Sequence, residues 1–245
     1  MSEICRDDFC AYLEASFARN GLTALLNEER ISLFYTLTEH MLSENEQYNL
    51  TAIKEPHKII DLHYADSLAA AGLIPEGARL LDVGCGAGFP SLPLAICRPD
   101  LTITALDSTA KRTSYVEKTA ALLGLTNLRT VTARAEDAAK TELRESFDLV
   151  TARAVAALPV LSELCLPFVR VGGVFLALKG RGASEELDAA RGGIARLGGK
   201  VEKILSLSIL RPEETLEHTA VLIAKTAKTP ALYPRNYSAI VKKPL

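Results

Sequence analysis

The sequence lacks several features that would place it at once in a class of protein. Its 245 residues carry 28 basic and 30 acidic side chains, so no excess of positive charge indicates a nucleic-acid partner. None of the five cysteines forms a Cys-x-x-Cys pair, and the four histidines are equally dispersed. We therefore expect reduced thiols, as in cytoplasmic proteins, and no metal site.

Long hydrophobic runs are also missing. The first eight residues have neither the basic nor the apolar segment of a signal peptide. The most apolar stretch, residues 154–169, is interrupted by Pro159, Glu163 and Pro167, and falls short of the roughly 20 apolar residues that a membrane helix needs. These absences predict a cytoplasmic protein without a membrane span.

The near-neutral total charge hides an uneven distribution. The last 28 residues contain five basic side chains and no acidic one, so the first 217 carry a net charge of −7. Residues 1–60 alone contain ten acidic and five basic side chains. We expect the N-terminal surface to repel phosphate groups and the basic surplus to be confined to the C-terminal end.

Hydrophobic spacing predicts three regions, which are a helical cap over residues 1–72, an α/β domain over 73–226 and a basic tail over 227–245. Apolar residues recur every three or four positions in the cap, which indicates three helices, the third from about residue 57 to 72. The predicted strands are residues 79–83, 101–106, 128–131, 147–150, 173–179, 201–209 and 220–224. The first five alternate with helical patterns, which predicts a parallel sheet with helices on both faces, and the last two form an antiparallel hairpin.

The turn after the first predicted strand carries the most informative motif. Gly84, Gly86 and Gly88 stand there, and glycine lets a ligand approach the bare backbone. Asp107 ends the second strand 19 residues after Gly88, where its carboxylate can accept hydrogen bonds from a ribose diol. A glycine turn can also be a plain tight connection, but together with Asp107 it indicates a site for a nucleoside cofactor.

The glycine spacing argues against a dinucleotide cofactor, because the third glycine of that fingerprint would stand where this chain has Phe89. The G-x-G-x-G spacing instead resembles motif I of class I S-adenosylmethionine-dependent methyltransferases. In such a fold Ala135 and Glu136 follow the third strand beside the adenine, and Arg153 follows the fourth strand at the same edge. Each of these three can also be an ordinary surface residue.

Further motifs follow one another along almost the whole chain. They are Tyr48-Asn49-Leu50-Thr51, His63 with Asp66-Ser67, Asp82 to Pro90, Leu106-Asp107-Ser108 with Lys111-Arg112, Arg134-Ala135-Glu136, Arg153-Ala154, Leu178-Lys179-Gly180, Tyr233-Pro234-Arg235 and Lys243-Pro244-Leu245. In this order they resemble one family, the bacterial small-subunit ribosomal RNA guanine-N7 methyltransferases (RsmG, also called GidB). One departure is residues 236–241, which replace the glycine-threonine-proline stretch common in that family.

The resemblance implies a Rossmann-like fold with a largely parallel seven-stranded sheet and an antiparallel last strand. It implies S-adenosylmethionine as the cofactor and methyl transfer to N7 of guanine 527 in 16S ribosomal RNA of the small ribosomal subunit, and we expect a monomer. The implied cofactor-binding residues are Gly84, Gly86, Gly88, Phe89, Asp107, Ser108, Ala135, Glu136 and Arg153.

The chemistry of guanine N7 fits a chain without an evident catalytic triad. This nitrogen has an in-plane lone pair and no proton, so its methylation requires positioning rather than a general base. Arg153 is the candidate positioning residue. Basic side chains that can contact RNA or guanine O6 are Arg153, Lys179, Arg181 and Arg235, and each can equally be a solvated surface charge.

Four cap residues of the family motifs receive a structural interpretation. We expect Tyr48 and Asn49 to end a helix, and His63 and Asp66, three positions apart on a helix, to interact locally. Packing of the cap on the core is favoured over a catalytic role for all four. Their place in the motifs leaves open a second interpretation, in which the cap shapes the pocket for the target base.

Two other functions stay open from the residues alone. One is a methyltransferase that acts on another RNA, a protein or a small molecule, and the other is a non-catalytic RNA-binding protein with a Rossmann-like fold. Methylation of adenine N6 is disfavoured because residues 151–154 lack the Asn/Asp-Pro-Pro-aromatic motif. Methylation of a pyrimidine C5 is disfavoured because Cys165 lies in an apolar helix pattern typical of the core.

Overall fold

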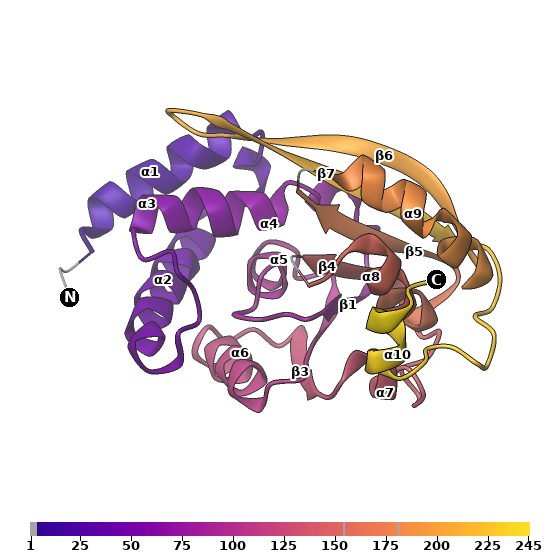
Figure 1. Ribbon diagram of the computed structural model, residues 1–245. Helices are drawn as coiled ribbons and strands as arrows, with labels where there is room; N and C mark the ends of the chain where they lie inside the picture. The colour runs from indigo at the N-terminus through magenta and orange to yellow at the C-terminus, as the bar shows by residue number, and fades with distance from the viewer. Residues whose placement is uncertain (1–3, 154, 181) are drawn as a thin grey trace.

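One seven-stranded sheet forms the centre of the computed structural model, which describes residues 4–153, 155–180 and 182–245. The strands, in the spatial order β3-β2-β1-β4-β5-β7-β6, are β1 Arg79–Val83, β2 Thr102–Asp107, β3 Leu128–Thr132, β4 Phe147–Arg153, β5 Val169–Lys179, β6 Gly199–Leu210 and β7 Thr215–Lys225. Strands β1 to β5 run parallel, and β7 lies antiparallel between β5 and β6 (Figure 1). The predicted Rossmann-like sheet with its antiparallel last strand is confirmed.

Helices cover both faces of the sheet. They are α1 Arg6–Arg19, α2 Glu28–Tyr48, α3 Pro56–Ile59, α4 Asp66–Leu68, α5 Ser91–Cys97, α6 Ala110–Leu122, α7 Ala135–Ala138, α8 Leu158–Cys165, α9 Ala183–Arg196 and α10 Tyr237–Lys242. Successive side chains of a strand point to opposite faces of the sheet. Leu80 therefore packs on one face, in a cluster with the helices of the cap and with α5 and α6, whereas Leu81 packs on the other face with α8 and α9. Both faces of the sheet are therefore packed against helices.

The third predicted cap helix is present, but it is not a regular α-helix. The chain is helical from Pro56 to Leu68, and the middle segment, Ile60–Ala65, is a π-helix. Helix α2 ends at Tyr48 as expected, because Asn49 takes the left-handed conformation (φ 50°) that stops a helix. Short 3₁₀ turns at Thr23–Leu25, Ala71–Leu73 and Leu166–Phe168 complete the helical segments.

The cap and the sheet share one hydrophobic core. Phe17 and Phe34 of the cap belong to the same buried cluster as Leu80 and Ile103 of the sheet. The buried Asp61 carboxylate ties the cap helices together, since it accepts hydrogen bonds from the Tyr12 hydroxyl at 2.7 Å and from another α1 hydroxyl at 2.6 Å. The division into domains at residues 72 and 226 stays a prediction.

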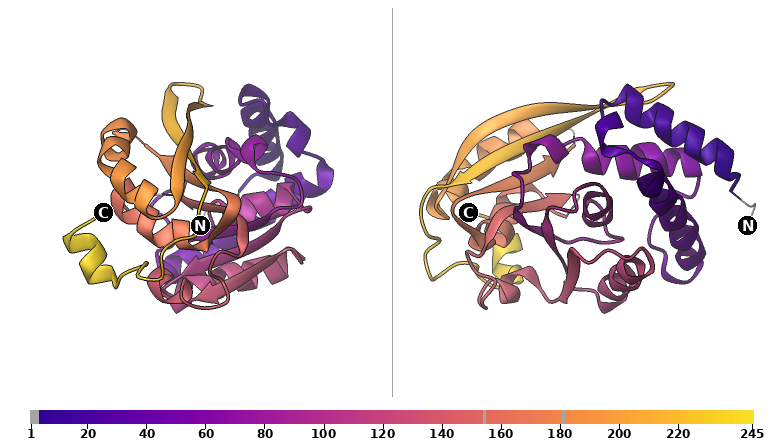
Figure 2. Two further views of the ribbon diagram at one scale, coloured as in Figure 1. Left: turned by 90° about the vertical axis from the view of Figure 1, so that its right-hand side faces the viewer. Right: turned by 180° about the vertical axis from the view of Figure 1, so that it is seen from behind.

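The β6–β7 hairpin is longer than predicted and reaches beyond the sheet. Its tip extends over α1, as the two opposite views show (Figures 1 and 2). The side-chain amide of Asn20 pairs with the backbone of Leu210 there, donating at 3.1 Å and accepting at 2.8 Å. Within the described ranges, every helix is too short or too polar to cross a membrane.

Candidate functional site

The carboxyl ends of β1, β2, β3 and β4 meet at one edge of the sheet. The strand order reverses between β1 and β4, and parallel sheets of this kind bind ligands beside such a reversal. The turn after β1 is held against β2, because the backbone N–H groups of Gly84 and Cys85 both donate to the Leu106 carbonyl, at 2.7 and 3.0 Å. The glycine turn and the ends of the neighbouring strands thus form one rim.

Asp107, the last residue of β2, binds the backbone of the two loops that form this rim. Its buried carboxylate accepts a hydrogen bond from the Gly86 N–H at 3.1 Å through Oδ2 and from the Thr109 N–H at 2.8 Å through Oδ1. The Arg112 guanidinium lies 3.5 Å from Oδ2. Each carboxylate oxygen has more than one lone pair, so Asp107 can hold both loops and still accept hydrogen bonds from a ligand.

A cavity of about 340 Å³, here called the β2–β3 cavity, opens beside Asp107. Its lining residues are Val83, Gly84, Leu106, Asp107, Ser108, Arg112, Ala133, Arg134, Ala135, Glu136, Val155, Leu164 and Tyr237. Four of the predicted cofactor residues, including Ala135 and Glu136, therefore line one space with Gly84. Glu136 is a largely buried residue of this cavity wall, and its carboxylate can accept a hydrogen bond from a ligand there.

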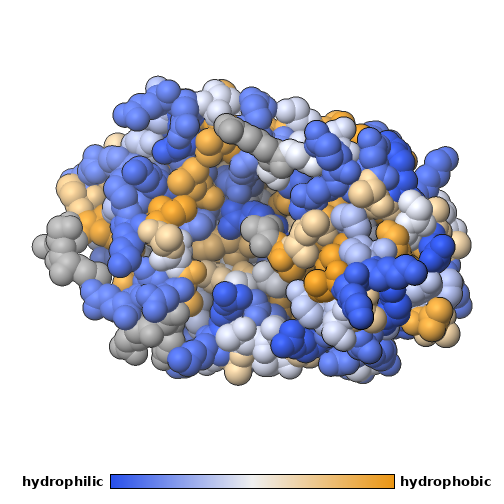
Figure 3. All heavy atoms as spheres, in the orientation of Figure 1, coloured by the Kyte–Doolittle hydropathy of each residue, from blue (hydrophilic) through white to orange (hydrophobic). Residues whose placement is uncertain are grey.

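A second cavity of about 530 Å³, the central cavity, adjoins the first at Gly84 and Arg112. Its lining residues are Leu50, Thr51, Leu62, His63, Asp66, Gly84, Cys85, Gly86, Ala87, Phe89, Arg112, Arg153, Leu178, Lys179, Gly180, Leu207 and His218. In the view of Figure 3 the surface is hollowed near its middle, and both hydrophobic and hydrophilic residues border the hollow. The cap, the sheet and the β6–β7 hairpin all contribute to this space.

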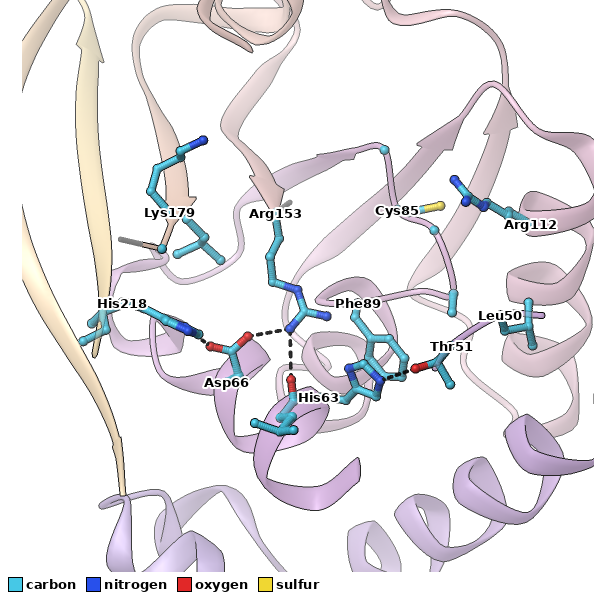
Figure 4. A pocket seen from close by; sticks show the side chains of 17 residues that line it. Leu50, Thr51, His63, Asp66, Cys85, Phe89, Arg112, Arg153, Lys179 and His218 are labelled. Atoms are coloured by element: carbon cyan, nitrogen blue, oxygen red, sulfur yellow. Dashed lines mark hydrogen bonds and ion pairs between the residues drawn. The ribbon is translucent and has the colours of Figure 1, made fainter. Parts of the chain in front are cut away.

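Asp66 joins Arg153 and His218 at the wall of the central cavity (Figure 4). One carboxylate oxygen binds the Arg153 Nη1 at 2.5 Å, and the other binds the His218 Nδ1 at 2.6 Å. Burial alone would raise the pKa of Asp66, but the His218 hydrogen bond and the Arg153 charge outweigh it and hold the pKa below its usual value. The hydrogen bond to Asp66 raises the pKa of His218.

An aromatic pair forms another wall of the central cavity. The His63 ring stacks on Phe89 with centroids 4.4 Å apart and planes 6° from parallel, and its Nε2 lies 2.9 Å from the Thr51 hydroxyl. Burial lowers the pKa of His63 to about 4, and the positive charge of Arg153 acts in the same direction. His63 is therefore neutral at pH 7 and acts as a flat ring.

His63 and Asp66 are not hydrogen-bonded to each other in the described part of the chain, but the Asp66 charge acts on His63 and opposes the effect of burial on its pKa. The two side chains bind different partners, Thr51 for His63 and Arg153 with His218 for Asp66. Both residues line the central cavity, which supports the interpretation that the cap shapes a pocket; the Tyr48 side chain lies outside the described part.

The candidate RNA-contacting residues lie in different places. Lys179 lines the central cavity, but its ammonium turns to the Ala156 carbonyl and the Glu186 carboxylate, both at 2.8 Å (Figure 4). Arg235 lines neither cavity, and its guanidinium binds the fully buried Glu163 carboxylate at 2.9 and 2.6 Å. Arg181 lies outside the described residues. Contact of these three with RNA stays a prediction.

Sequence reasoning missed several residues that line the cavities, among them His218 and Tyr237. His218 comes from the hairpin, 152 positions after Asp66, and Tyr237 comes from the tail. No local pattern marks either of them. Among the described residues, no group of three His, Cys, Asp or Glu side chains is placed to hold a metal ion.

The residues present fit S-adenosylmethionine. A side chain at Gly84 would fill the junction of the cavities, since an added Cβ would lie 2.6 Å from a Val155 methyl group. The β2–β3 cavity offers the Asp107 carboxylate, suited to a ribose diol, and the Glu136 carboxylate, suited to the adenine amino group. The adjoining central cavity leaves room for the remainder of the cofactor and for an acceptor.

Solved structures share the fold of this chain. TYW2 from M. jannaschii in complex with AdoMet has a TM-score of 0.52 and 17% identity, over 65% of this chain and 74% of that chain. TYW2 from P. horikoshii in complex with MeSAdo has a TM-score of 0.52 and 14% identity, over 65% of this chain and 61% of that chain. The fold is that of class I S-adenosylmethionine-dependent methyltransferases.

Sequence comparisons identify the family within this class. The family model described as "rRNA small subunit methyltransferase G" (GidB) matches residues 30–214. A protein named ribosomal RNA small subunit methyltransferase G from Clostridium perfringens is 42% identical over 89% of this chain and 92% of its own length. A protein of the same name from Staphylococcus saprophyticus is 41% identical over 96% and 98%. The chain belongs to the GidB family.

Proposed function

We propose that the protein transfers the methyl group of S-adenosylmethionine to N7 of a guanine in 16S ribosomal RNA, the position that the family resemblance gives as 527. The observation that carries the proposal is the pair of adjoining cavities at the β1–β4 reversal. One cavity presents acceptors for an adenosine, and the other presents a flat ring pair and an arginine for a base. The names of the relatives point to the same substrate class.

The cofactor is proposed to span both cavities. Asp107 would accept the ribose hydroxyls and Glu136 the adenine amino group in the β2–β3 cavity, while the turn at Gly84 would let the sulfonium end pass into the central cavity. The cofactor supplies an electrophilic methyl group on a positively charged sulfur. The chain itself then has only to orient the acceptor.

The target guanine is proposed to occupy the central cavity beside Phe89 and His63. Arg153 keeps donors that Asp66 does not use, and these suit guanine O6 or the carboxylate of the cofactor. The N7 lone pair forms the new N–C bond as the S–C bond breaks, and no proton has to leave the guanine. Holding the reacting atoms in line is worth several kcal/mol of barrier, so positioning alone accounts for this chemistry.

The protein is proposed to act as a monomer in the cytoplasm, on the small ribosomal subunit or its RNA. Its candidate RNA contacts are Lys179, which lines the central cavity, Arg181, and Arg235 in the tail. RNA is not expected to approach over the acidic surface of the cap, because phosphate is repelled there. Contact from the side of the hairpin and of the strand ends is therefore favoured.

Transfer of labelled methyl groups to undermodified small ribosomal subunits tests this proposal. We expect incorporation into 16S ribosomal RNA, with N7-methylguanine as the only labelled nucleoside after digestion, and mapping should place it at one guanine. Subunits that already carry the modification serve as the matched control and should accept no label, because their N7 lone pair is already used.

Other outcomes separate the alternatives. Label at a different atom or base contradicts the N7 assignment, but the protein would still be a methyltransferase. Label found only in proteins or small molecules favours the alternative acceptor. Absence of S-adenosylmethionine binding in calorimetry overturns the enzymatic proposal and favours an RNA-binding protein.

A further inference from the structure

The C-terminal helix α10 borders the β2–β3 cavity. Tyr237, its first residue, lines that cavity together with Asp107 and Glu136, although it follows them by more than 100 positions. Figure 1 shows α10 next to α7, the helix that begins at Ala135. The tail thus reaches the space in which the adenine is placed.

The tail is anchored on both sides of Tyr237. On one side, Arg235 binds the buried Glu163 carboxylate of α8 with its backbone N–H at 2.8 Å and with its guanidinium. On the other side, Ile240 is fully buried in the core beneath the helix. The Asn236 side chain caps the helix by accepting the Ala239 N–H at 2.9 Å. These contacts fix the backbone on both sides of Tyr237, and its side chain lines the cavity from there.

The surroundings of the ring suit a flat, electron-rich ligand. The Arg134 guanidinium lies 5.8 Å from the centre of the Tyr237 ring, close enough for a cation–π contact. Tyr237 is nevertheless 42% exposed, which is unusual for an aromatic side chain in a cavity wall. Val155 and Leu164 supply apolar surface to the same cavity. A nucleobase would cover exposed ring surface here.

We propose that Tyr237 is a cofactor-binding residue on which the adenine of S-adenosylmethionine packs, with Arg134 supporting the ring. The C-terminal helix is then part of the cofactor site, beside the glycine turn and the strand ends. This inference rests on the proposed function, because it takes S-adenosylmethionine as the ligand. It assigns to the tail a role in cofactor binding that is separate from any contact with RNA.

Calorimetry with S-adenosylhomocysteine on the full chain tests the inference. Tyr237→Ala should weaken binding by about tenfold, the usual scale of a lost base–aromatic contact. Tyr237→Phe should bind within about twofold of the wild type, because it keeps the ring. Val241→Ala, on the same helix but lining neither cavity, is the matched control and should bind like the wild type.

A second probe, 5′-methylthioadenosine, locates the effect. It carries the adenine and the ribose but no amino-acid group, so Tyr237→Ala should weaken its binding by the same factor. Unchanged binding of either probe by Tyr237→Ala overturns the inference, and so does an equal loss in Tyr237→Phe. Failure of the wild-type protein to bind S-adenosylhomocysteine is a different result, since it overturns the proposed function itself.

Discussion

At the scale of single residues, Gly84 illustrates how backbone geometry opens the site. Its φ of +76° lies in the left-handed region, which costs other residues about 1–2 kcal/mol. A Cβ at this position would also lie 2.6 Å from the Val155 Cγ2, and Val155 lines the β2–β3 cavity. A side chain at Gly84 therefore strains the turn and pushes a neighbour into the cavity.

Gly84→Ala should lower the affinity for S-adenosylhomocysteine by at least about tenfold, equivalent to roughly 1.4 kcal/mol. Gly124→Ala is the matched control, because Gly124 has a similar φ of +66° but open space around its Cβ position. Both variants should lose about 1–2 kcal/mol of stability in urea unfolding from the left-handed conformation, with the larger loss in Gly84→Ala because of the added contact with Val155, and only Gly84→Ala should lose affinity. Equal affinities of the two variants in calorimetry would contradict the assigned site.

At the scale of elements, Asp66 connects three parts of the chain. It stands where the π-helix passes into α4, binds Arg153 at the end of β4 and binds His218 on β7. Because the pKa of Asp66 is lowered in the folded protein, this residue stabilises the fold at pH values above its unfolded pKa of about 4. Because the pKa of His218 is raised, this residue stabilises the fold at pH values below its unfolded pKa of about 6.5. The Asp66–His218 pair therefore contributes most to the free energy of unfolding between about pH 4 and pH 6.5.

His218→Ala should destabilise the protein most near pH 5 to 6, by about 1 kcal/mol, since solvent screens the partly exposed imidazole. The difference from the wild type should shrink as the pH rises through the pKa of His218, because the imidazole loses its charge. It should also shrink as the pH falls through the pKa of Asp66. Urea unfolding from pH 4 to 9 measures this difference, and a difference that does not vary with pH counts against the ion pair.

His218→Gln is the control, because glutamine can donate a hydrogen bond to Asp66 without a charge. Its stability relative to the wild type should vary with pH in the same way as that of the alanine variant. The alanine variant should be less stable than the glutamine variant at every pH.

Local sequence patterns predicted the elements better than the contacts between them. The strand positions followed from apolar runs, and Asp107 followed from its spacing after the glycine turn, because both signals lie within a short stretch of chain. The π-helix was missed, since hydrophobic spacing does not report which hydrogen bonds a helix makes. His218 and Tyr237 were missed because their places depend on the hairpin register and on the Arg235–Glu163 contact, 72 positions apart.

At the scale of the whole molecule, the basic tail is a structural part of the fold. Arg235 and the fully buried Glu163 form its anchor, and Arg144 adds hydrogen bonds to the carbonyls of Thr229 and Tyr233 at 2.8 and 2.9 Å. Part of the positive charge of the tail is therefore neutralised by an ion pair within the protein. A loss of RNA binding in a tail variant has to be separated from a loss of folding.

Arg235→Ala should lower the stability by about 3 kcal/mol, because it leaves the Glu163 carboxylate buried without its partner. In a chain of this size that corresponds to roughly 6–12 °C in melting temperature. Arg170→Ala is the control: it removes an exposed arginine whose partner, Asp148, is partly exposed, and should cost less than about 1 kcal/mol.

Adding Glu163→Gln to Arg235→Ala should recover part of the loss, because no buried charge then stays unpaired. Thermal melting of the two single variants and of the double variant measures these effects. A melting temperature of Arg235→Ala equal to that of the wild type would contradict the anchoring role of the ion pair.

The hydrophobic core shared by the cap and the sheet has a consequence for synthesis. Phe17 and Leu37 belong to the same buried cluster as Ile209 and Ala220, which the ribosome adds near the end of the chain. During translation the residues of β1, α5, β2 and α6 can cover much of the apolar side of the cap, but the part of this cluster that the hairpin completes stays exposed until β6 and β7 emerge. Chains that stop before the hairpin should be substrates for chaperones and proteases, although all the residues of the glycine turn are already present.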